Sequence, residues 1–188
     1  MSTNFPILDA NSAPAESKPI LEGAQKAMGF VPNLFGLFAT SPAVFEAYTT
    51  LAGILDQKTD FSETERQTLF LTISALNDCT YCVAAHSTIS KAKKVDDAVV
   101  QAIRDRAPIA DPKLQALRTF AEAVVSTRGF VEAPALDAFR AAGYGDRHVL
   151  EVVLAVAFKT ISNYSTHIAS PELDSAFQPQ AWNAPAAV

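Results

Sequence analysis

The sequence contains few cysteines and no long hydrophobic run. Its only two cysteines among 188 residues, Cys79 and Cys82, lie three positions apart. A disulfide between them would close a very small loop, so a structural disulfide framework is excluded and the pair is expected to serve chemistry or metal binding. The longest apolar run, Val152 to Phe158, is far too short to span a bilayer.

Basic residues are also scarce. No run of lysine or arginine is longer than a pair, and the formal net charge is −5. This charge pattern lacks the basic patch by which proteins bind nucleic acid or an anionic membrane, so both classes of protein are excluded. The first residues, Met1 to Pro6, lack a basic segment followed by an apolar stretch, so neither export nor membrane insertion is expected. We therefore expect a cytoplasmic protein with no nucleic-acid or membrane partner.

Apolar residues make up 49% of the chain and charged residues only 19%. A surface so poor in charge is expected to be covered partly by other subunits, which favours a homo-oligomer. The length fits one domain over residues 1–188. Residues 1–15 carry no apolar periodicity and are expected to form an extended N-terminal arm.

Helical periodicity with capping signals recurs along the chain, and no segment shows strand alternation. We predict an all-α fold: a single-domain bundle of about seven to eight helices, with a short additional helical segment at 31–39. The other expected helices span about 16–28, 42–57, 62–76, 79–93, 96–104, 112–127, 133–142 and 146–167.

A break between two helices is expected next to the cysteines. Ser62 and Glu65 form a capping-box signature that begins a largely buried helix. Asn77 and Asp78 interrupt this helix, and because their side chains cap helices well, the next helix is expected to begin at Cys79. The Cys-x-x-Cys motif would then lie at the start of a helix.

Positions i, i+3 and i+7 share one face of a helix, so Cys79, Cys82 and His86 form one stripe. The free N–H groups and the macrodipole at a helix N-terminus stabilise an anion there, and a protonated His86 would add to this effect. The motif therefore favours a reactive thiolate.

Three interpretations of the cysteine pair are open. A redox dithiol would cycle through a sulfenic acid and an internal disulfide without a cofactor. A metal site would need further ligands, for which only the distant His148 and His167 are available. The third is that both residues are small buried side chains packed in a helix.

The residues around the motif resemble the alkyl hydroperoxidase D-like branch of the carboxymuconolactone decarboxylase superfamily, and within it the peroxidase-related members. The resemblance rests on 61–67, 76–86, 29–35, Ser41-Pro42, 162–169 and 181–182. It implies an all-α fold, trimers or hexamers, and reduction of organic hydroperoxides at the expense of a thiol reductant. By the same resemblance Cys82 is the peroxidatic thiol, Cys79 the proton donor and resolving thiol, and His86 part of a proton relay.

One position departs from the family pattern. The hydroperoxidases carry a glutamate twelve residues before the first cysteine, and this sequence has Gln67. An amide cannot accept the thiol proton. Glu65 lies about 200° round the helix and Glu63 a turn further from the thiols, so neither simply replaces it. Two interpretations of this departure are open. In the first, Gln67 holds a water between itself and His86, with the imidazole as the base. In the second, peroxidase activity is weak and the dithiol serves another exchange reaction.

The leading functional hypothesis is a dithiol peroxidase that acts on small apolar organic hydroperoxides. The first alternative is a non-enzymatic redox sensor or oligomeric interaction protein. The second is a decarboxylase-type lyase, although the decarboxylases of the superfamily lack the cysteine pair.

The segment that contains the motif has weak sequence similarity to a second segment of the chain. Without gaps, residues 61–86 lie over 142–167, which pairs His86 with His167 and Cys82 with Asn163. This overlay indicates a possible duplicated helical unit in which only the first copy carries thiols.

Overall fold

The computed structural model describes residues 5–185, and within this range the chain is helical with no strand. The predicted all-α fold is confirmed. The helices are α1 (Lys18–Met28), α2 (Asn33–Phe38), α3 (Pro42–Gln57), α4 (Glu63–Leu76), α5 (Thr80–Ala92), α6 (Asp97–Arg104), α7 (Pro112–Thr127), α8 (Ala133–Ala141) and α9 (Asp146–Ala169), followed by the 3₁₀ turn η1 (Gln178–Gln180). In the part of the chain that is described, no helix is long and apolar enough to cross a membrane.

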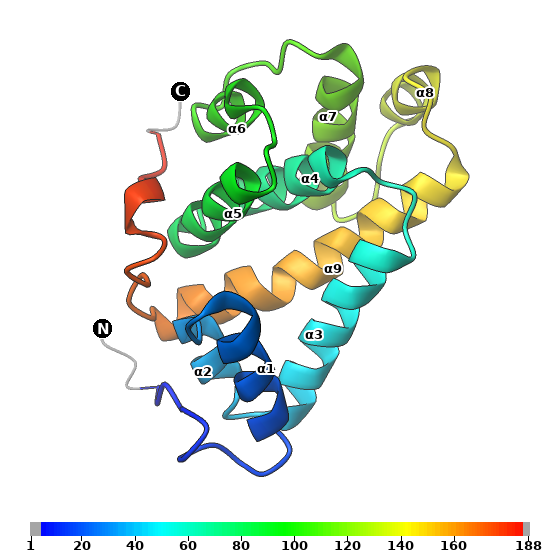
Figure 1. The fold of residues 1–188 in the computed structure, drawn as a ribbon. Helices are drawn as coiled ribbons and strands as arrows, with labels where there is room; N and C mark the ends of the chain where they lie inside the picture. Colours follow the sequence, from blue (N-terminus) through cyan, green and yellow to red (C-terminus); the bar gives the residue numbers. More distant parts are fainter. Residues whose placement is uncertain (1–4, 186–188) are drawn as a thin grey trace.

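Helix α4 is the centre of the bundle. It packs against α5, α6, α7 and α9, and also contacts α3 (Figure 1). Most of its residues are buried, including the polar side chains Gln67, Thr68 and Thr72. A helix covered on all sides holds its side chains in fixed positions, so α4 is a rigid support for whatever its polar residues contact.

Helix α9 is the longest element and crosses the molecule beside α3 (Figure 1). Aromatic side chains fix this crossing: the ring of Tyr48 on α3 stacks on Phe158 of α9 at 4.5 Å between centroids. A second stack, Phe120 on Phe139 at 4.2 Å and Phe139 on Tyr144 at 4.5 Å, joins α7, α8 and the start of α9. Burial of these rings supplies much of the hydrophobic stabilisation.

The expected break before the cysteines is present, but its capping differs from the prediction. Cys79 itself is the N-cap of α5, because its Sγ accepts from the Cys82 N–H at 3.4 Å. Asp78 adopts a left-handed conformation with φ of 54°, which short polar side chains tolerate, and its carboxylate pairs with Arg106. Asn77 instead donates to Asn163 Oδ1 at 3.0 Å. Asn77 and Asp78 therefore turn the chain and do not cap α5.

The two ends of the described chain pack on the bundle. Residues 5–17 contain turns but no helix, and the Leu8 N–H donates to the Gly36 carbonyl at 3.0 Å. A Cβ at Gly36 would lie 2.8 Å from the Leu8 carbonyl oxygen, so this close approach requires glycine. Of the predicted arm, residues 1–4 lie outside the described residues. The C-terminal segment, red in Figure 1, runs back along α5 and α6, where Trp182 donates to the Arg104 carbonyl at 3.0 Å.

Candidate active site

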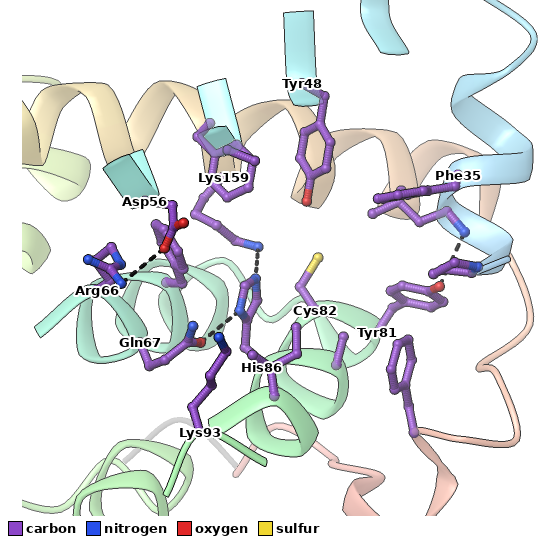
Figure 2. A pocket seen from close by; sticks show the side chains of 18 of the residues that line it. Phe35, Tyr48, Asp56, Arg66, Gln67, Tyr81, Cys82, His86, Lys93 and Lys159 are labelled. Carbon is purple, nitrogen blue, oxygen red and sulfur yellow. Dashed lines mark hydrogen bonds and ion pairs between the residues drawn. The ribbon is translucent and has the colours of Figure 1, made fainter. Parts of the chain in front are cut away.

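A cavity of about 340 Å³ lies between α2, α3, α4, α5, α9 and the C-terminal segment. Most of its wall is apolar, with rings contributed by Phe35, Phe70, Phe158 and Phe177. Its polar lining includes Gln67, Cys82, His86 and Lys159, which lie near one another (Figure 2). Other polar side chains that line the cavity include those of Tyr48, Tyr81 and Lys93. An apolar chamber with few convergent polar groups is typical of a small-molecule site.

The two cysteines occupy different surroundings. Both are buried free thiols, and Cys82 lines the cavity with its sulfur directed into it (Figure 2). Cys79 lies behind it, with Sγ 3.1 Å from Thr166 Oγ1 on α9. The predicted stripe of Cys79, Cys82 and His86 therefore divides: Cys82 and His86 line the cavity, and Cys79 faces the core.

The environment places the shared proton of the pair on Cys79. Burial raises the pKa of the Cys82 thiol, but the hydrogen bond from Cys79, the charge of Lys159 and hydrogen bonds from Asn163 and Ser162 outweigh burial, and the net pKa of Cys82 is lowered. The hydrogen bond to Cys82 and burial raise the pKa of Cys79. The proton of the pair is therefore favoured on Cys79 and the negative charge on Cys82, the sulfur that faces the cavity.

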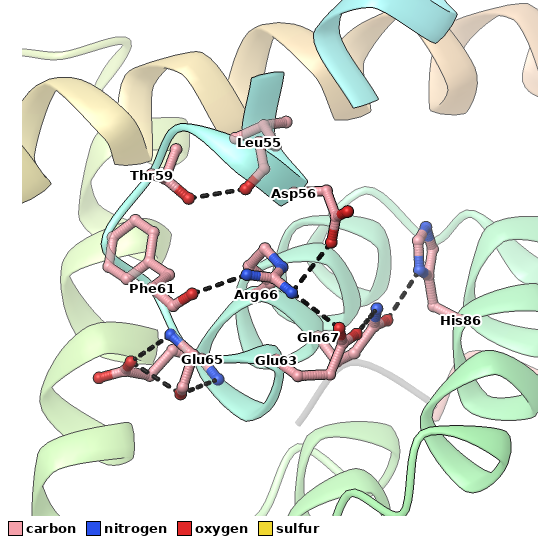
Figure 3. A network of polar contacts seen from close by, with 10 residues as sticks. Leu55, Asp56, Thr59, Phe61, Glu63, Glu65, Arg66, Gln67 and His86 are labelled. Carbon is pink, nitrogen blue, oxygen red and sulfur yellow. Dashed lines mark hydrogen bonds and ion pairs between the residues drawn. The ribbon is translucent and has the colours of Figure 1, made fainter. Parts of the chain in front are cut away.

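His86 is held in one tautomer by a chain of hydrogen bonds from α4. Gln67 Nε2 donates to Glu63 Oε1 at 2.9 Å, which leaves Gln67 Oε1 to accept from His86 Nδ1 at 3.0 Å (Figure 3). The other ring nitrogen, Nε2, then carries a lone pair and accepts from Lys159 Nζ at 2.8 Å. Because Gln67 and His86 are in direct contact, the interpretation in which a water lies between them is wrong.

The cation of the site is Lys159, which the sequence analysis missed. Burial and the neighbouring Lys159 charge lower the pKa of His86, so the imidazole is neutral at pH 7 and adds no positive charge beside the thiols. A sequence signal for Lys159 exists. The polar residues Lys159, Ser162, Asn163 and Thr166 recur at helical spacing on an otherwise apolar helix, and all four are buried on the face of α9 that meets the cysteines.

An ion-pair cluster closes the end of the cavity near α3. Arg66 Nη2 lies 3.1 Å from Asp56 Oδ1 and 2.8 Å from Glu63 Oε2, and its Nη1 donates to the Phe61 carbonyl at 2.7 Å (Figure 3). Asp56, Glu63 and Arg66 also line the cavity. The cluster ties the end of α3 to the start of α4 and fixes Glu63, the last member of the hydrogen-bond chain from His86.

The two histidines considered as additional metal ligands are engaged elsewhere. His148 Nδ1 accepts from the Gly145 N–H at 3.0 Å at the start of α9, and the exposed ring of His167 stacks on Tyr164. Within residues 5–185 no group of three or more His, Cys, Asp or Glu side chains is arranged to hold a metal ion.

Comparison with solved structures identifies the fold. A peroxidase-related protein with an alkylhydroperoxidase AhpD core, from Ralstonia eutropha JMP134, aligns with a TM-score of 0.83 and 23% identity over 94% of this chain and 95% of its own. A peroxidase-related protein from Silicibacter sp. TM1040 aligns at 0.80 and 20% over 94% and 93%. The debrominase Bmp8, in complex with 2,3,4-tribromopyrrole, aligns at 0.80 and 18% over 96% of each chain.

The chain therefore has the helical fold of the AhpD-like proteins. Residues 42–123 match the model of the carboxymuconolactone decarboxylase family, the family that the sequence resembles. The comparison with curated proteins found no match.

Proposed function

We propose that the chain is a dithiol oxidoreductase that reduces small apolar organic hydroperoxides. The observation that carries this proposal is the different placement of the two sulfurs: Cys82 lines the cavity in surroundings that lower its pKa, and Cys79 lies behind it in surroundings that raise its pKa. This is the arrangement that a nucleophilic thiol and a resolving thiol require.

The reaction proceeds in two balanced steps. The Cys82 thiolate attacks the terminal oxygen of ROOH, the O–O bond breaks, and the products are Cys82 sulfenic acid and RO⁻, which takes a proton and leaves as ROH. Cys79 then attacks the sulfenic sulfur, which forms the Cys79–Cys82 disulfide and releases water. An external dithiol restores the two thiols. The neutral His86 and the Lys159 ammonium lie where the proton and the developing charge must be handled.

Substrate class and partners follow from the cavity and the surface. The apolar wall suits a small organic hydroperoxide, and a protein or low-molecular-weight thiol would act as the reductant. Exposed apolar side chains on α9, among them Leu150, Val153 and Tyr164, support a homo-oligomer, which we propose to be a trimer or hexamer located in the cytoplasm. Sedimentation equilibrium would detect it, and a monomer at micromolar concentration would contradict it.

The test is consumption of cumene hydroperoxide with dithiothreitol as the reductant. We expect Cys82→Ser to lose turnover by about a thousandfold or more, because the nucleophile is gone. Cys79→Ser, assayed without dithiothreitol, is the matched control: it should consume one equivalent of peroxide and accumulate a Cys82 sulfenic acid that dimedone traps. Unchanged turnover in Cys82→Ser would refute the thiol mechanism. Disulfide formation without turnover would favour the redox sensor.

A second candidate is reductive dehalogenation of a haloaromatic. The debrominase that shares this fold suggests the reaction class, and the ring-lined cavity beside Cys82 favours a planar aromatic ligand. The protein undergoes the same oxidation as in peroxide reduction: its two thiols become a disulfide, while Ar–Br is reduced to Ar–H and bromide. Bromide release from 2,3,4-tribromopyrrole, measured beside the peroxide assay, would separate the two candidates.

A further inference from the structure

Lys159 is a buried cation with little to neutralise it. The residue is only 1% exposed, and its Nζ has one hydrogen-bond partner in the described chain, the neutral His86 Nε2. No carboxylate of residues 5–185 lies within ion-pair distance of this ammonium. Its other close neighbour is the ring of Phe158, 5.5 Å from Nζ to the centroid. An ammonium has three N–H donors, so two remain for groups in the cavity (Figure 2).

The hydrogen-bond chain from α4 orients this lysine as a donor. Gln67 Nε2 donates to Glu63, so Gln67 Oε1 must accept from His86, and His86 Nε2 must accept from Lys159. Each member is oriented by the one before it. The ammonium is thus directed at the cavity by a network that leaves its charge unpaired.

The Cys82 thiolate supplies the missing charge in the dithiol form. Cys82 and Lys159 line the same side of the cavity, and the attraction between them is one of the interactions that lower the pKa of Cys82. Oxidation removes this counter-charge, because a sulfenic acid or a disulfide sulfur at Cys82 is neutral. A buried cation without a counter-ion is costly, so the oxidised site has a strong demand for an anion.

We propose that Lys159 forms an anion-binding subsite beside Cys82, filled by the thiolate in the reduced protein and by an apolar organic monoanion in the oxidised protein. The inference rests on the proposed function only in that a thiol–disulfide cycle occurs. In peroxide reduction the first such anion is the departing RO⁻, which inherits the charge of the thiolate. The rings of Phe158 beside Lys159 and of Phe70 beside His86, with Phe35 further along the same cavity, select an anion with an apolar body, such as an aromatic carboxylate.

Binding of benzoate, measured by isothermal titration calorimetry, tests this subsite, with the isosteric neutral benzamide as the matched ligand. We expect the disulfide form to bind benzoate at least tenfold more tightly than benzamide, and at least tenfold more tightly than the reduced protein does. Cys82→Ser, which places a neutral hydroxyl at this position, should bind benzoate as the disulfide form does, without any oxidation step.

Charge variants locate the effect at Lys159. Lys159→Met should abolish the preference for benzoate over benzamide, whereas Lys159→Arg should keep part of it. Equal binding of benzoate and benzamide by the oxidised wild type, or a preference that survives Lys159→Met, would overturn the subsite. The wild-type comparison needs no variant to fold, and benzoate binding needs no turnover, so loss of the peroxidase proposal and loss of this one are separate results.

Discussion

Two buried charged side chains, Glu65 and Lys159, differ in how many polar partners surround them. Glu65 is 8% exposed, and its carboxylate accepts from the Ser62 N–H at 2.8 Å and from the Tyr144 hydroxyl at 2.9 Å, while Lys113 Nζ lies 2.9 Å away. Lys159 is buried still more deeply and has a single neutral partner, His86. The charge of Glu65 has fixed partners, whereas the only counter-charge available to Lys159 among the described residues is the Cys82 thiolate, which oxidation removes.

The difference separates a structural ion from a reactive one. The Glu65 cluster joins the start of α4 to α7 and to the loop before α9, and all its polar atoms are turned towards one another. Such closed clusters specify how elements pack. The Lys159 cluster leaves donors free at the cavity, where they can act on a ligand or a sulfur. Buried charge alone therefore does not mark the active site; a buried charge with unfilled partners does.

The largest expected effect is the loss of stability in Glu65→Ala. Removing the carboxylate leaves the buried Tyr144 hydroxyl without its acceptor and Lys113 without its partner, and we expect a loss of about 3 kcal/mol in the free energy of unfolding. Urea unfolding measures it. The control is Asp146→Ala, which breaks the exposed pair with Arg140 and should cost less than about 1 kcal/mol.

The same measurement on Lys159→Met would sharpen the comparison. Relief from burying an ammonium should offset the lost hydrogen bond to His86, so the change should stay within about 1 kcal/mol. A loss for Lys159→Met as large as that for Glu65→Ala would show that both charges are structural and would end the distinction.

An intermediate effect is expected in the pH dependence of stability. Burial raises the pKa of Glu65, but the hydrogen bonds from Lys113, Ser62 and Tyr144 outweigh it and lower the pKa to about 2. The pKa of His86 is also lowered in the folded state. In both cases the unfolded chain binds a proton that the folded chain does not, so stability is present at high pH and falls on acidification.

The two clusters should lose stability in separate pH ranges. The His86 contribution should begin to fall below about pH 6.5 and the Glu65 contribution below about pH 4.5, the latter by about 1–2 kcal/mol after allowance for the exposed Lys113. Urea midpoints between pH 8 and 3 would show this. His86→Gln should flatten the upper range and Glu65→Gln the lower one; a curve unchanged in both variants would contradict the assignment.

The smallest expected effect is a gain in Gln67→Glu. A carboxylate at this position would accept from His86 Nδ1 and make the imidazole more basic, so we expect peroxidase turnover at neutral pH to rise a few-fold. Glu63 lies 2.9 Å from the Gln67 amide and would repel a second carboxylate. The double variant with Glu63→Gln removes that repulsion and should show the larger gain. An equal or lower rate in both folded variants would remove Gln67 from the relay.

Much of the helical scaffold could be predicted because its signals are local. The capping box at Ser62 and Glu65, and the proline at the start of α3, mark helix starts within a residue or two of those observed. The cysteine motif was recognisable at the start of a helix for the same reason. Asn77 and Asp78 were misread because a cap and a left-handed turn use the same short polar side chains, and only tertiary partners decide between them.

The role of Lys159 as the cation of the site could not be predicted, because it depends on contacts between helices that are distant in sequence. The spacing of Lys159 with Ser162, Asn163 and Thr166 marks a polar face of the helix, but nothing local says whether that face is buried. Its burial depends on α3, α4 and α5, which pack against α9. The overlay of residues 61–86 on 142–167 pairs Cys82 with Asn163, and these two side chains do meet in the structure. It also pairs His86 with His167, of which one is buried and the other exposed. The overlay was informative about position but not about role.

The thiol chemistry cannot be transferred to a shorter protein without the polar face of α9. The segment that matches the family model, residues 42–123, contains both thiols, His86 and Gln67, yet it ends before Lys159, Asn163 and Thr166. A smaller protein made from that segment would keep the nucleophile and lose the groups that ionise it. The reactive unit is thus a contact between two halves of the chain, and its acidity is a property that no excised motif would carry with it.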